Sequence, residues 1–385
     1  MTILSLKRPP YDSFSFRLFF RLSNSIPQAD KIYIWSIVME SNYKLNYEYN
    51  GEIISECETD FRQKLIDFIS NPIVILGVKD HLTAGNFNPW NESKPSSVNY
   101  LEDMIKFYSD KKFILFTSLE NLDQYLNLSN LTIIPWGGDI TNQESEYKKL
   151  EPVLEKNLNS SYTYISLNRN HRNHRTVALS KLFSLGLEKY GLISCMFKEK
   201  LTEMPSWPFK KNDTIFEGFD KLKKYSFNIV DDENIYGKNP NSNVENFNFK
   251  LKNYYSDVFI EIINETSFTE KCFNLTEKTL NSFYGCNFPI MLSSAGSVEF
   301  LRNIGFDMFD DIIDHSYDLI VDPIDRIHSA IYNNKNLLMG EAKELWPKNI
   351  DRFLSNVDIA KNKMYSYFSN RAQTEFYKVL NEDLQ

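Results

Sequence analysis

Residues 162–182, YTYISLNRNHRNHRTVALSKL, decide the fold of this chain of 385 residues. The run Tyr162–Leu167 is rich in aromatic and β-branched side chains, which predicts a buried strand. A basic loop follows, and apolar residues then recur at helical spacing from about Asn173 to Tyr190, which predicts a helix. A strand followed by a helix is the repeating unit of an α/β fold. We therefore expect an α/β domain to begin at this stretch.

The same alternation occupies the chain before residue 160. The apolar runs predict strands at 31–39, 72–77, 111–117 and 131–136, and the spacing between them predicts helices at 60–70, 98–108, 119–126 and 144–155. Short strands separated by helices are typical of a mostly parallel sheet with helices on its faces. We expect two α/β domains, 1–159 and 160–385.

The second domain continues with predicted strands at 258–263 and 288–292 and predicted helices at 276–284 and 296–304. The polar, Asn-rich stretch 211–253 predicts a surface excursion. An apolar stripe at helical spacing predicts a long closing helix over 350–382 that crosses back to the first domain. The stripe consists of Phe353, Val357, Ala360, Met364, Tyr367, Phe368, Ala372, Phe376 and Val379.

The composition is that of a globular protein, with 42% hydrophobic and 24% charged residues, and it excludes wholesale disorder. No apolar run approaches the roughly 18 residues of a membrane span. The cysteines show no CxxC spacing, so we expect a reducing, cytoplasmic setting, in a bacterial host if a phage encodes the chain. The net charge of −8 argues against a general nucleic-acid coat.

The basic loop carries Arg169, Arg172 and Arg175, with His171 and His174 between them. Ligands of open α/β sheets bind at the carboxyl ends of strands, where a following helix start favours an anion. Guanidinium groups bind phosphate in a bidentate manner. The loop therefore predicts a phosphate clamp, with a solvated basic loop as the plain alternative. The two histidines have metal-ligand spacing, but no third ligand accompanies them.

A second group of polar residues surrounds the predicted helix at 276–284. Glu265 follows a buried strand, and Thr276 has the character of an N-cap. Lys278 in the first turn opposes the helix dipole unless it faces a bound anion, and Glu277 beside it can accept ribose hydroxyls. The alternative is a capping turn with solvated charges. Gly296 precedes the next predicted helix, and the start of that helix is a further candidate for contact with a ligand.

These motifs, in order, resemble the nucleotide-sugar half of glycosyltransferases with two Rossmann-like domains that face each other across a cleft, the GT-B type. The series is NR…HR after a strand, then FIEIINET, then TEKT…FPIMLSSAGSVEFLRNIGF…SYD, over roughly residues 160 to 320. It is most similar to fucosyltransferase-like enzymes and to related proteins of bacteriophages.

The resemblance implies that Glu277 binds the ribose, Lys278 a phosphate, and Arg175 the pyrophosphate, with Arg169 or Arg172 as alternatives for the last role. Glu265 joins this predicted donor site from its strand end. The implied reaction moves a sugar from a nucleotide-sugar co-substrate to a hydroxyl of a glycan or small molecule, with inversion. We expect no metal and no other cofactor, because the cations and helix starts can stabilise the leaving diphosphate.

The general base should be a carboxylate or histidine of the acceptor-binding domain 1–159. Glu40, Asp80, His81 and Asp139 follow predicted strands there, and Asp80 is the first candidate. Two alternatives keep the fold: a phage glycosyltransferase that modifies hydroxymethylated DNA bases, and a binding module without catalysis. A kinase or dehydrogenase is disfavoured, since neither GxGxxG nor GxxxxGK[ST] follows a predicted strand.

Overall fold

The chain forms two compact units in the computed structural model, Met1–Gln143 with Tyr365–Gln385, and Glu144–Met364. The structure describes residues 32–34, 44–49, 52–57, 73–78, 102, 105–107, 109–110, 112–117, 120, 123, 126–135, 147–169, 171–201, 213–227, 251–265, 268 and 275–382. Both units are mixed α/β with parallel sheets, which confirms the α/β part of the predicted fold class.

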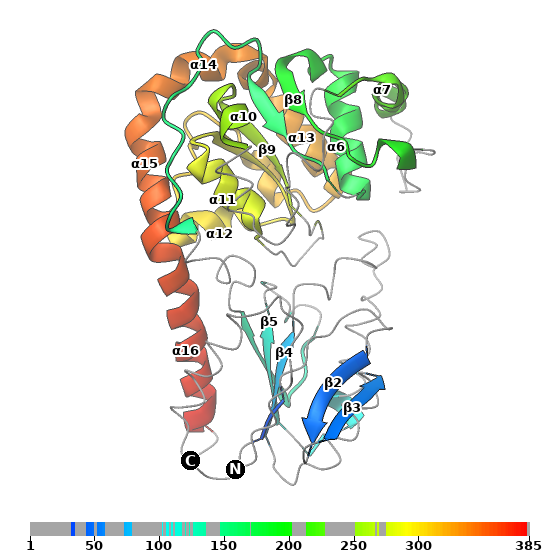
Figure 1. Cartoon of the computed structure of the whole chain (residues 1–385), viewed down its shortest axis with the longest axis vertical. Coiled ribbons are helices and arrows are strands. Elements are labelled where there is room, and N and C mark those ends of the chain that lie inside the picture. The colour runs from blue at the N-terminus through cyan, green and yellow to red at the C-terminus, as the bar shows by residue number, and fades with distance from the viewer. Residues whose placement is uncertain are drawn as a thin grey trace. The chain divides into compact units, whose positions relative to one another are not determined.

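The described strands of the first unit form a four-stranded parallel sheet in the order β1-β4-β5-β6 (Figure 1). Its strands are β1 (Ile32–Ile34), β4 (Ile73–Val78), β5 (Lys112–Thr117) and β6 (Leu131–Pro135). All four fall on predicted strands. Two further strands, β2 (Lys44–Tyr49) and β3 (Glu52–Cys57), form an antiparallel pair that the sequence pattern did not indicate.

The closing stretch is helical, as the apolar spacing predicts. It comprises α15 (Ile350–Asp358), a π turn (Ile359–Lys363) and α16 (Met364–Glu382). Phe368, Ala372 and Phe376 of α16 are buried. Arg371 of α16 donates to the Glu120 carboxylate at 2.8 Å, within the first unit. The last helix therefore belongs with the first 143 residues.

The second unit holds a four-stranded parallel sheet among its described residues, in the order β10-β9-β7-β8. Its strands are β7 (Tyr164–Ser166), β8 (Gly191–Ile193), β9 (Ile260–Asn264) and β10 (Phe288–Leu292). Every residue of these strands is buried, which explains why they read as continuous apolar runs without alternation. The predicted strand 288–292 matches β10 residue for residue.

Helices cover this sheet (Figure 1). They are α6 (Asn173–Ser184), α7 (Asp213–Lys224), α10 (Lys252–Ser256), α11 (Glu277–Tyr284), α12 (Ser297–Ile304), α13 (Pro323–Asn333) and α14 (Ala342–Leu345). Shorter turns lie at Glu188–Tyr190, Lys198–Lys200, Ser316–Leu319, Leu337–Glu341 and Trp346–Asn349. Helix α6 ends before the predicted Tyr190 because Gly186 takes a left-handed φ of 68°.

The predicted helix at 144–155 is wrong for its second half, since residues 150–157 are not helical. Pro152 has no N–H to donate and disfavours helical geometry in the residue before it. The segment instead contacts the end of α11, where Val153 N donates to Tyr284 O at 2.9 Å. Lys156 Nζ donates to three oxygens, Tyr255 O and Gly285 O at 2.6 Å and Asn287 Oδ1 at 2.8 Å. Burial lowers the pKa of Lys156 to about 7.

The predicted surface excursion at 211–253 is also wrong in part. It contains α7, which packs on α6 and buries Phe219 and Leu222. The two helices approach so closely that a Cβ on Gly218 would collide with the Ser180 carbonyl. The polar composition obscured this helix, because its apolar face is narrow. Within the part of the chain that the structure describes, no helix is both long and apolar enough to cross a membrane.

Candidate functional site

The site lies at the carboxyl edge of the second sheet, between β7 and β9. From β7 the chain passes through α6 to β8 on one side, and it then returns to β9 on the other side of β7. The two connections diverge at this point, which is the usual ligand position in open α/β sheets. The basic loop follows β7 and Glu265 follows β9, so the topology brings the two predicted groups to one edge.

Helix α6 starts with no carboxylate. Its N-cap is Arg172, no described side chain caps it, and its first turn holds no acidic residue. Most helices begin with Ser, Thr, Asp or Asn, whose oxygen accepts a free N–H. The partial positive charge of this helix start is instead joined by the half-buried Arg172 and the exposed Arg169. This combination favours an anion.

His174 and Arg175 tie the start of α6 to the end of β9. Arg175 Nη2 donates to Asn264 O at 3.1 Å and to Glu265 O at 3.4 Å. His174 Nε2 lies 3.0 Å from Glu265 O and must carry the proton, since a carbonyl only accepts. Burial, and then the charge of Arg175, hold the pKa of His174 well below its ordinary value, so the ring is neutral. It stacks on Phe268 at 4.8 Å.

Helix α11 begins at Thr276, the predicted N-cap, whose Oγ1 accepts from Lys278 N. The carboxylate of Glu265 holds this helix start. Its Oε1 accepts from Thr276 N at 3.0 Å and from Thr279 Oγ1 at 2.6 Å, and its Oε2 accepts from Thr276 Oγ1 at 2.6 Å. Glu265 is fully buried. The structure thus places this predicted donor residue against α11.

Glu277 and Lys278 form an ion pair of 3.0 Å in the first turn of α11. Burial alone would raise the pKa of Glu277, but the Lys278 ammonium, a main-chain N–H and Thr276 together outweigh it, and the pKa lies below its ordinary value. The charges of Arg172 and Lys278 both act on the His174 ring. The basic loop and the start of α11 therefore converge on one place.

Buried polar atoms without a protein partner among the described residues also lie at this edge. They are Asn168 Oδ1 after β7, Asn264 Oδ1 at the end of β9 and Ser293 Oγ after β10. Buried polar atoms in proteins normally bond to protein, water or ligand, so this edge suits a polar ligand. The residues were not singled out from the sequence. Their signal was position, since each ends or follows a predicted strand.

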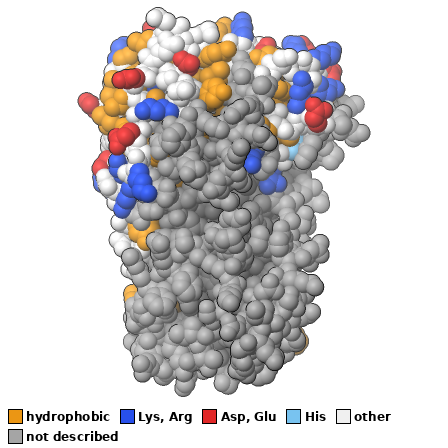
Figure 2. All heavy atoms as spheres, in the orientation of Figure 1, with side chains coloured by type: hydrophobic (Ala, Val, Ile, Leu, Met, Phe, Trp, Pro, Cys, Tyr) orange, Lys and Arg blue, Asp and Glu red, His pale blue; other side chains and the backbone are white. Residues whose placement is uncertain are grey.

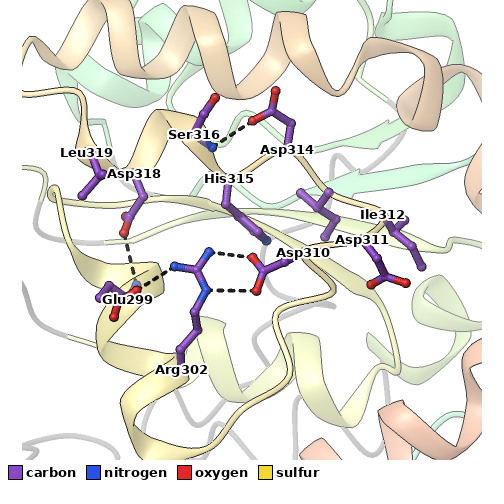
Figure 3. Close-up of a pocket in the computed structure, with 11 residues that line it drawn as sticks. Glu299, Arg302, Asp310, Asp311, Ile312, Asp314, His315, Ser316, Asp318 and Leu319 are labelled. Carbon is purple, nitrogen blue, oxygen red and sulfur yellow. Dashed lines mark hydrogen bonds and ion pairs between the residues drawn. The ribbon is translucent and has the colours of Figure 1, made fainter.

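A pocket of about 700 Å³ lies beside the start of α12 (Figure 3). Acidic side chains dominate its lining, which includes Glu299, Asp310, Asp311, Asp314 and Asp318. Arg302 is the cation drawn among them. Its Nη2 and Nε donate to Asp310 at 2.6 and 3.1 Å, and its Nη1 to Glu299 at 2.9 Å. This lining disfavours a phosphate.

The start of α12 is filled by Asp318. The Asp318 carboxylate accepts from Val298 N at 3.2 Å and Glu299 N at 3.1 Å, with Ser297 Oγ at 3.5 Å. Gly296 takes a φ of 83° at the N-cap, which glycine adopts without strain. The helix predicted from Gly296 is therefore present, but its free N–H groups bind a carboxylate of the chain itself.

The predicted general bases Glu40, Asp80 and His81, and also Asp139, lie outside the described residues. His171 packs edge-on against Phe197 at 5.1 Å, away from the contacts of His174. Among the described residues, no group of three or more His, Cys, Asp or Glu side chains is arranged to hold a metal ion.

Comparison of the chain with models of known protein families finds no match, and comparison with curated protein sequences finds none either.

Proposed function

We propose that this protein is a glycosyltransferase of the GT-B type that moves a sugar from a nucleotide-sugar donor to a hydroxyl acceptor. The second unit, Glu144–Met364, binds the donor, and the first unit, Met1–Gln143 with Tyr365–Gln385, binds the acceptor, a glycan or a small hydroxylated molecule. Transfer inverts the sugar carbon and needs no metal or other cofactor. The proposal combines the resemblance of the sequence motifs with the chemistry of the β7–β9 edge.

One observation carries the proposal: the uncapped, basic start of α6 and the Glu277–Lys278 pair of α11 converge at the point where the sheet connections diverge. A diphosphate needs several cationic or N–H donors. Arg169, Arg172 and Lys278 supply the cations, and α6 supplies the N–H groups. Arg175 contributes its positive charge without a direct contact to the diphosphate, because its guanidinium already donates to the carbonyls of Asn264 and Glu265 at the end of β9.

These groups match the charge that develops in the reaction. As the bond from sugar to diphosphate breaks, negative charge grows on the leaving phosphate, and fixed cations at that place lower the barrier. Glu277, with its pKa held below the ordinary value, is an ionised acceptor for ribose hydroxyls. Asn168 Oδ1 and Asn264 Oδ1 offer further acceptors to hydroxyl or amide donors of the ligand.

The acceptor hydroxyl must lose its proton during transfer, and Asp80 is the first candidate for the base, followed by His81 and Glu40. In Asp80→Asn we expect transfer to fall by about 10²-fold or more while donor affinity stays within about twofold. Equal transfer by the variant and the unchanged protein would exclude Asp80 and leave His81→Gln and Glu40→Gln as the next tests.

The donor assignment is tested by thermal unfolding of the full chain with UDP, GDP, CDP and dTDP and with their sugar conjugates. A ligand present at about 100 times its Kd stabilises the folded protein by about 2.7 kcal/mol. We expect one nucleoside diphosphate to raise Tm clearly, and the matching nucleoside to do so weakly. If no nucleotide raises Tm and radiolabelled nucleotide sugars are not consumed, the glycosyltransferase proposal is wrong.

DNA is the alternative acceptor. Among the side chains that are coloured in Figure 2, basic ones are interspersed with acidic ones rather than joined into a stripe. With the net charge of −8, this supports a glycan or small acceptor over DNA. Binding of hydroxymethylated duplex DNA that weakens steeply between low and moderate salt would reverse this preference.

A further inference from the structure

We propose that Glu265 is a positioning residue of the donor site. Its carboxylate fixes the direction of the Thr276 hydroxyl, and through that hydroxyl it fixes the Lys278 ammonium, without touching the donor. The inference rests on the proposed function, in which Lys278 binds the diphosphate of the nucleotide sugar.

The Glu265 carboxylate is already engaged by α11. It is fully buried, and it accepts two hydroxyl contacts of 2.6 Å and one main-chain N–H at 3.0 Å. Contacts of 2.6 Å have the length of charge-assisted O–H···O⁻ bonds. An ionised carboxylate only accepts, so both threonine hydroxyls must direct their protons to it. The Glu265 carboxylate is therefore directed toward Thr276 and Thr279.

The Thr276 hydroxyl transmits this constraint. A hydroxyl has one proton and two acceptor positions. The proton goes to Glu265, and this leaves the lone pairs of Oγ1 for Lys278 Nζ at 3.0 Å and Lys278 N at 3.4 Å. Lys278 Nζ also donates to Glu277 Oε1 at 3.0 Å. The ammonium is thus held by two acceptors whose positions are set in the first turn of α11.

Glu265 also binds the other half of the site through its main chain. Its carbonyl oxygen accepts from His174 Nε2 at 3.0 Å and lies 3.4 Å from Arg175 Nη2. One residue at the end of β9 therefore joins the first turn of α6 to the first turn of α11. This fixes the first turn of α6 relative to the helix turn that carries Lys278.

A Glu265→Gln substitution breaks this chain of contacts with little change in volume. In the unchanged protein each oxygen of the Glu265 carboxylate accepts from at least one donor. The amide NH₂ group of the glutamine must therefore face one of these donors. Where it meets Thr276 Oγ1, it competes with Lys278 Nζ for the same lone pairs. The ammonium then loses one of its two acceptors.

The test measures the affinity of the full chain for nucleoside diphosphates, UDP and GDP, by titration calorimetry. Four proteins are compared: the unchanged chain, Glu265→Gln, Lys278→Ala and the double variant. A contact to a charged group is worth about ten- to hundredfold in affinity, so we expect Lys278→Ala to lose that much and Glu265→Gln about tenfold. The double variant should bind no more weakly than Lys278→Ala alone, because Glu265 acts through Lys278.

Two controls separate positioning from general damage. Glu261→Gln alters another buried carboxyl of β9, and affinity should stay within about twofold. Thr276→Ser keeps the hydroxyl and should retain affinity, whereas Thr276→Val should match Glu265→Gln. Circular dichroism confirms that each variant is folded.

The inference is overturned if Glu265→Gln weakens binding by the same factor with and without Lys278, since the two residues then act independently. If the unchanged chain binds no nucleoside diphosphate, the proposed function fails instead. Positioning is then decided by hydrogen exchange in the first turn of α11. Faster exchange of the Lys278 amide in Glu265→Gln supports it, and unchanged exchange overturns it.

Discussion

Helices α6 and α12 both begin at the carboxyl edge of the same sheet, yet their starts have opposite surroundings. Helix α6 begins at Arg172 without a side-chain cap, and cations gather beside it. Helix α12 begins at Gly296, and the buried Asp318 carboxylate binds its first N–H groups. Both starts carry the partial positive charge of a helix dipole.

The difference shows what makes a helix start a binding site. At α12 an anion of the chain itself takes the place that a ligand would occupy, and Glu299 and Asp310 repel a second one. At α11 the Glu265 carboxylate accepts from the first N–H of the helix start, as Asp318 does at α12. The partly exposed Lys278 nevertheless adds a positive charge to the first turn of α11. Of these three helix starts, α6 alone has no capping carboxylate and no acidic residue in its first turn among the described residues. These contrasts support our proposal that a phosphate binds at α6 and Lys278.

Glu261 extends the comparison to a buried carboxyl with no helix start to bind. Glu261 Oε2 accepts a hydrogen bond from the Tyr255 hydroxyl at 2.9 Å, and burial raises the pKa of Glu261 to about 8. Between the unfolded pKa of 4.5 and this value, the folded state keeps a proton that the unfolded state has released. Its contribution to stability is therefore full below about pH 4.5 and is lost as the pH rises to about 8.

We expect the largest effect in Glu261→Gln. Its free energy of unfolding, relative to the unchanged protein, should rise by up to about 1.4 kcal/mol per pH unit across that window. Urea unfolding at pH 5, 6, 7 and 8 measures this. If the free energies of unfolding of the two proteins change with pH in parallel, the inference that folded Glu261 is protonated at pH 5 to 8 is wrong.

The second prediction concerns Arg172→Gln, which removes the charge at the start of α6 and leaves the main-chain N-cap in place. We expect nucleoside diphosphate affinity to fall about tenfold, because a charge-assisted contact is lost. Calorimetry at two salt concentrations measures the change, and the salt dependence should also become weaker. Unchanged affinity would show that the phosphate does not bind at α6.

The third prediction concerns Asp318→Asn at the start of α12. Asn keeps one acceptor but turns an NH₂ group toward an N–H of the helix, and we expect a loss of about 1 kcal/mol in the free energy of unfolding. The loss should be modest because burial raises the pKa of Asp318, so its charged form is already disfavoured there. Nucleotide affinity should not change, and a loss of affinity would place the ligand near α12.

The smallest effect is expected for Arg302→Ala, the matched control for Arg172 on the acidic side. Its partners Asp310 and Glu299 are more than half exposed, with 54% and 56% of their side chains accessible. Exposed ion pairs contribute about 0–1 kcal/mol, and salt reduces this further. Thermal unfolding and calorimetry should show a small loss of Tm and unchanged nucleotide affinity. A tenfold loss of nucleotide affinity in Arg302→Ala would mean that the start of α12 contributes to nucleotide binding as much as the start of α6, which contradicts the proposed site.

Much of the second unit could be predicted from its sequence. Short apolar runs predicted three of its four buried strands. Thr276 was predicted as an N-cap because its hydroxyl accepts from Lys278 N, only two positions along the chain. Local errors had local causes: Pro152 ended the helix predicted over 144–155, and the narrow apolar face of α7 was hidden in polar sequence. The strand β8 was missed because its sequence, Gly191–Ile193, holds just two large apolar side chains after a glycine.

The sequence by itself determined the α/β class, the starts of α11 and α12, and the gathering of charge after β7, because each depends on residues within a few positions of one another. Only the tertiary structure decided which carboxylate binds which helix start. Glu265 reaches Thr276 across 11 positions, Asp318 reaches Val298 across 20, and His174 meets Glu265 across 91. The order of strands in the sheet sets these meetings. A local sequence pattern does not encode that order, since each strand of this sheet is buried on both faces.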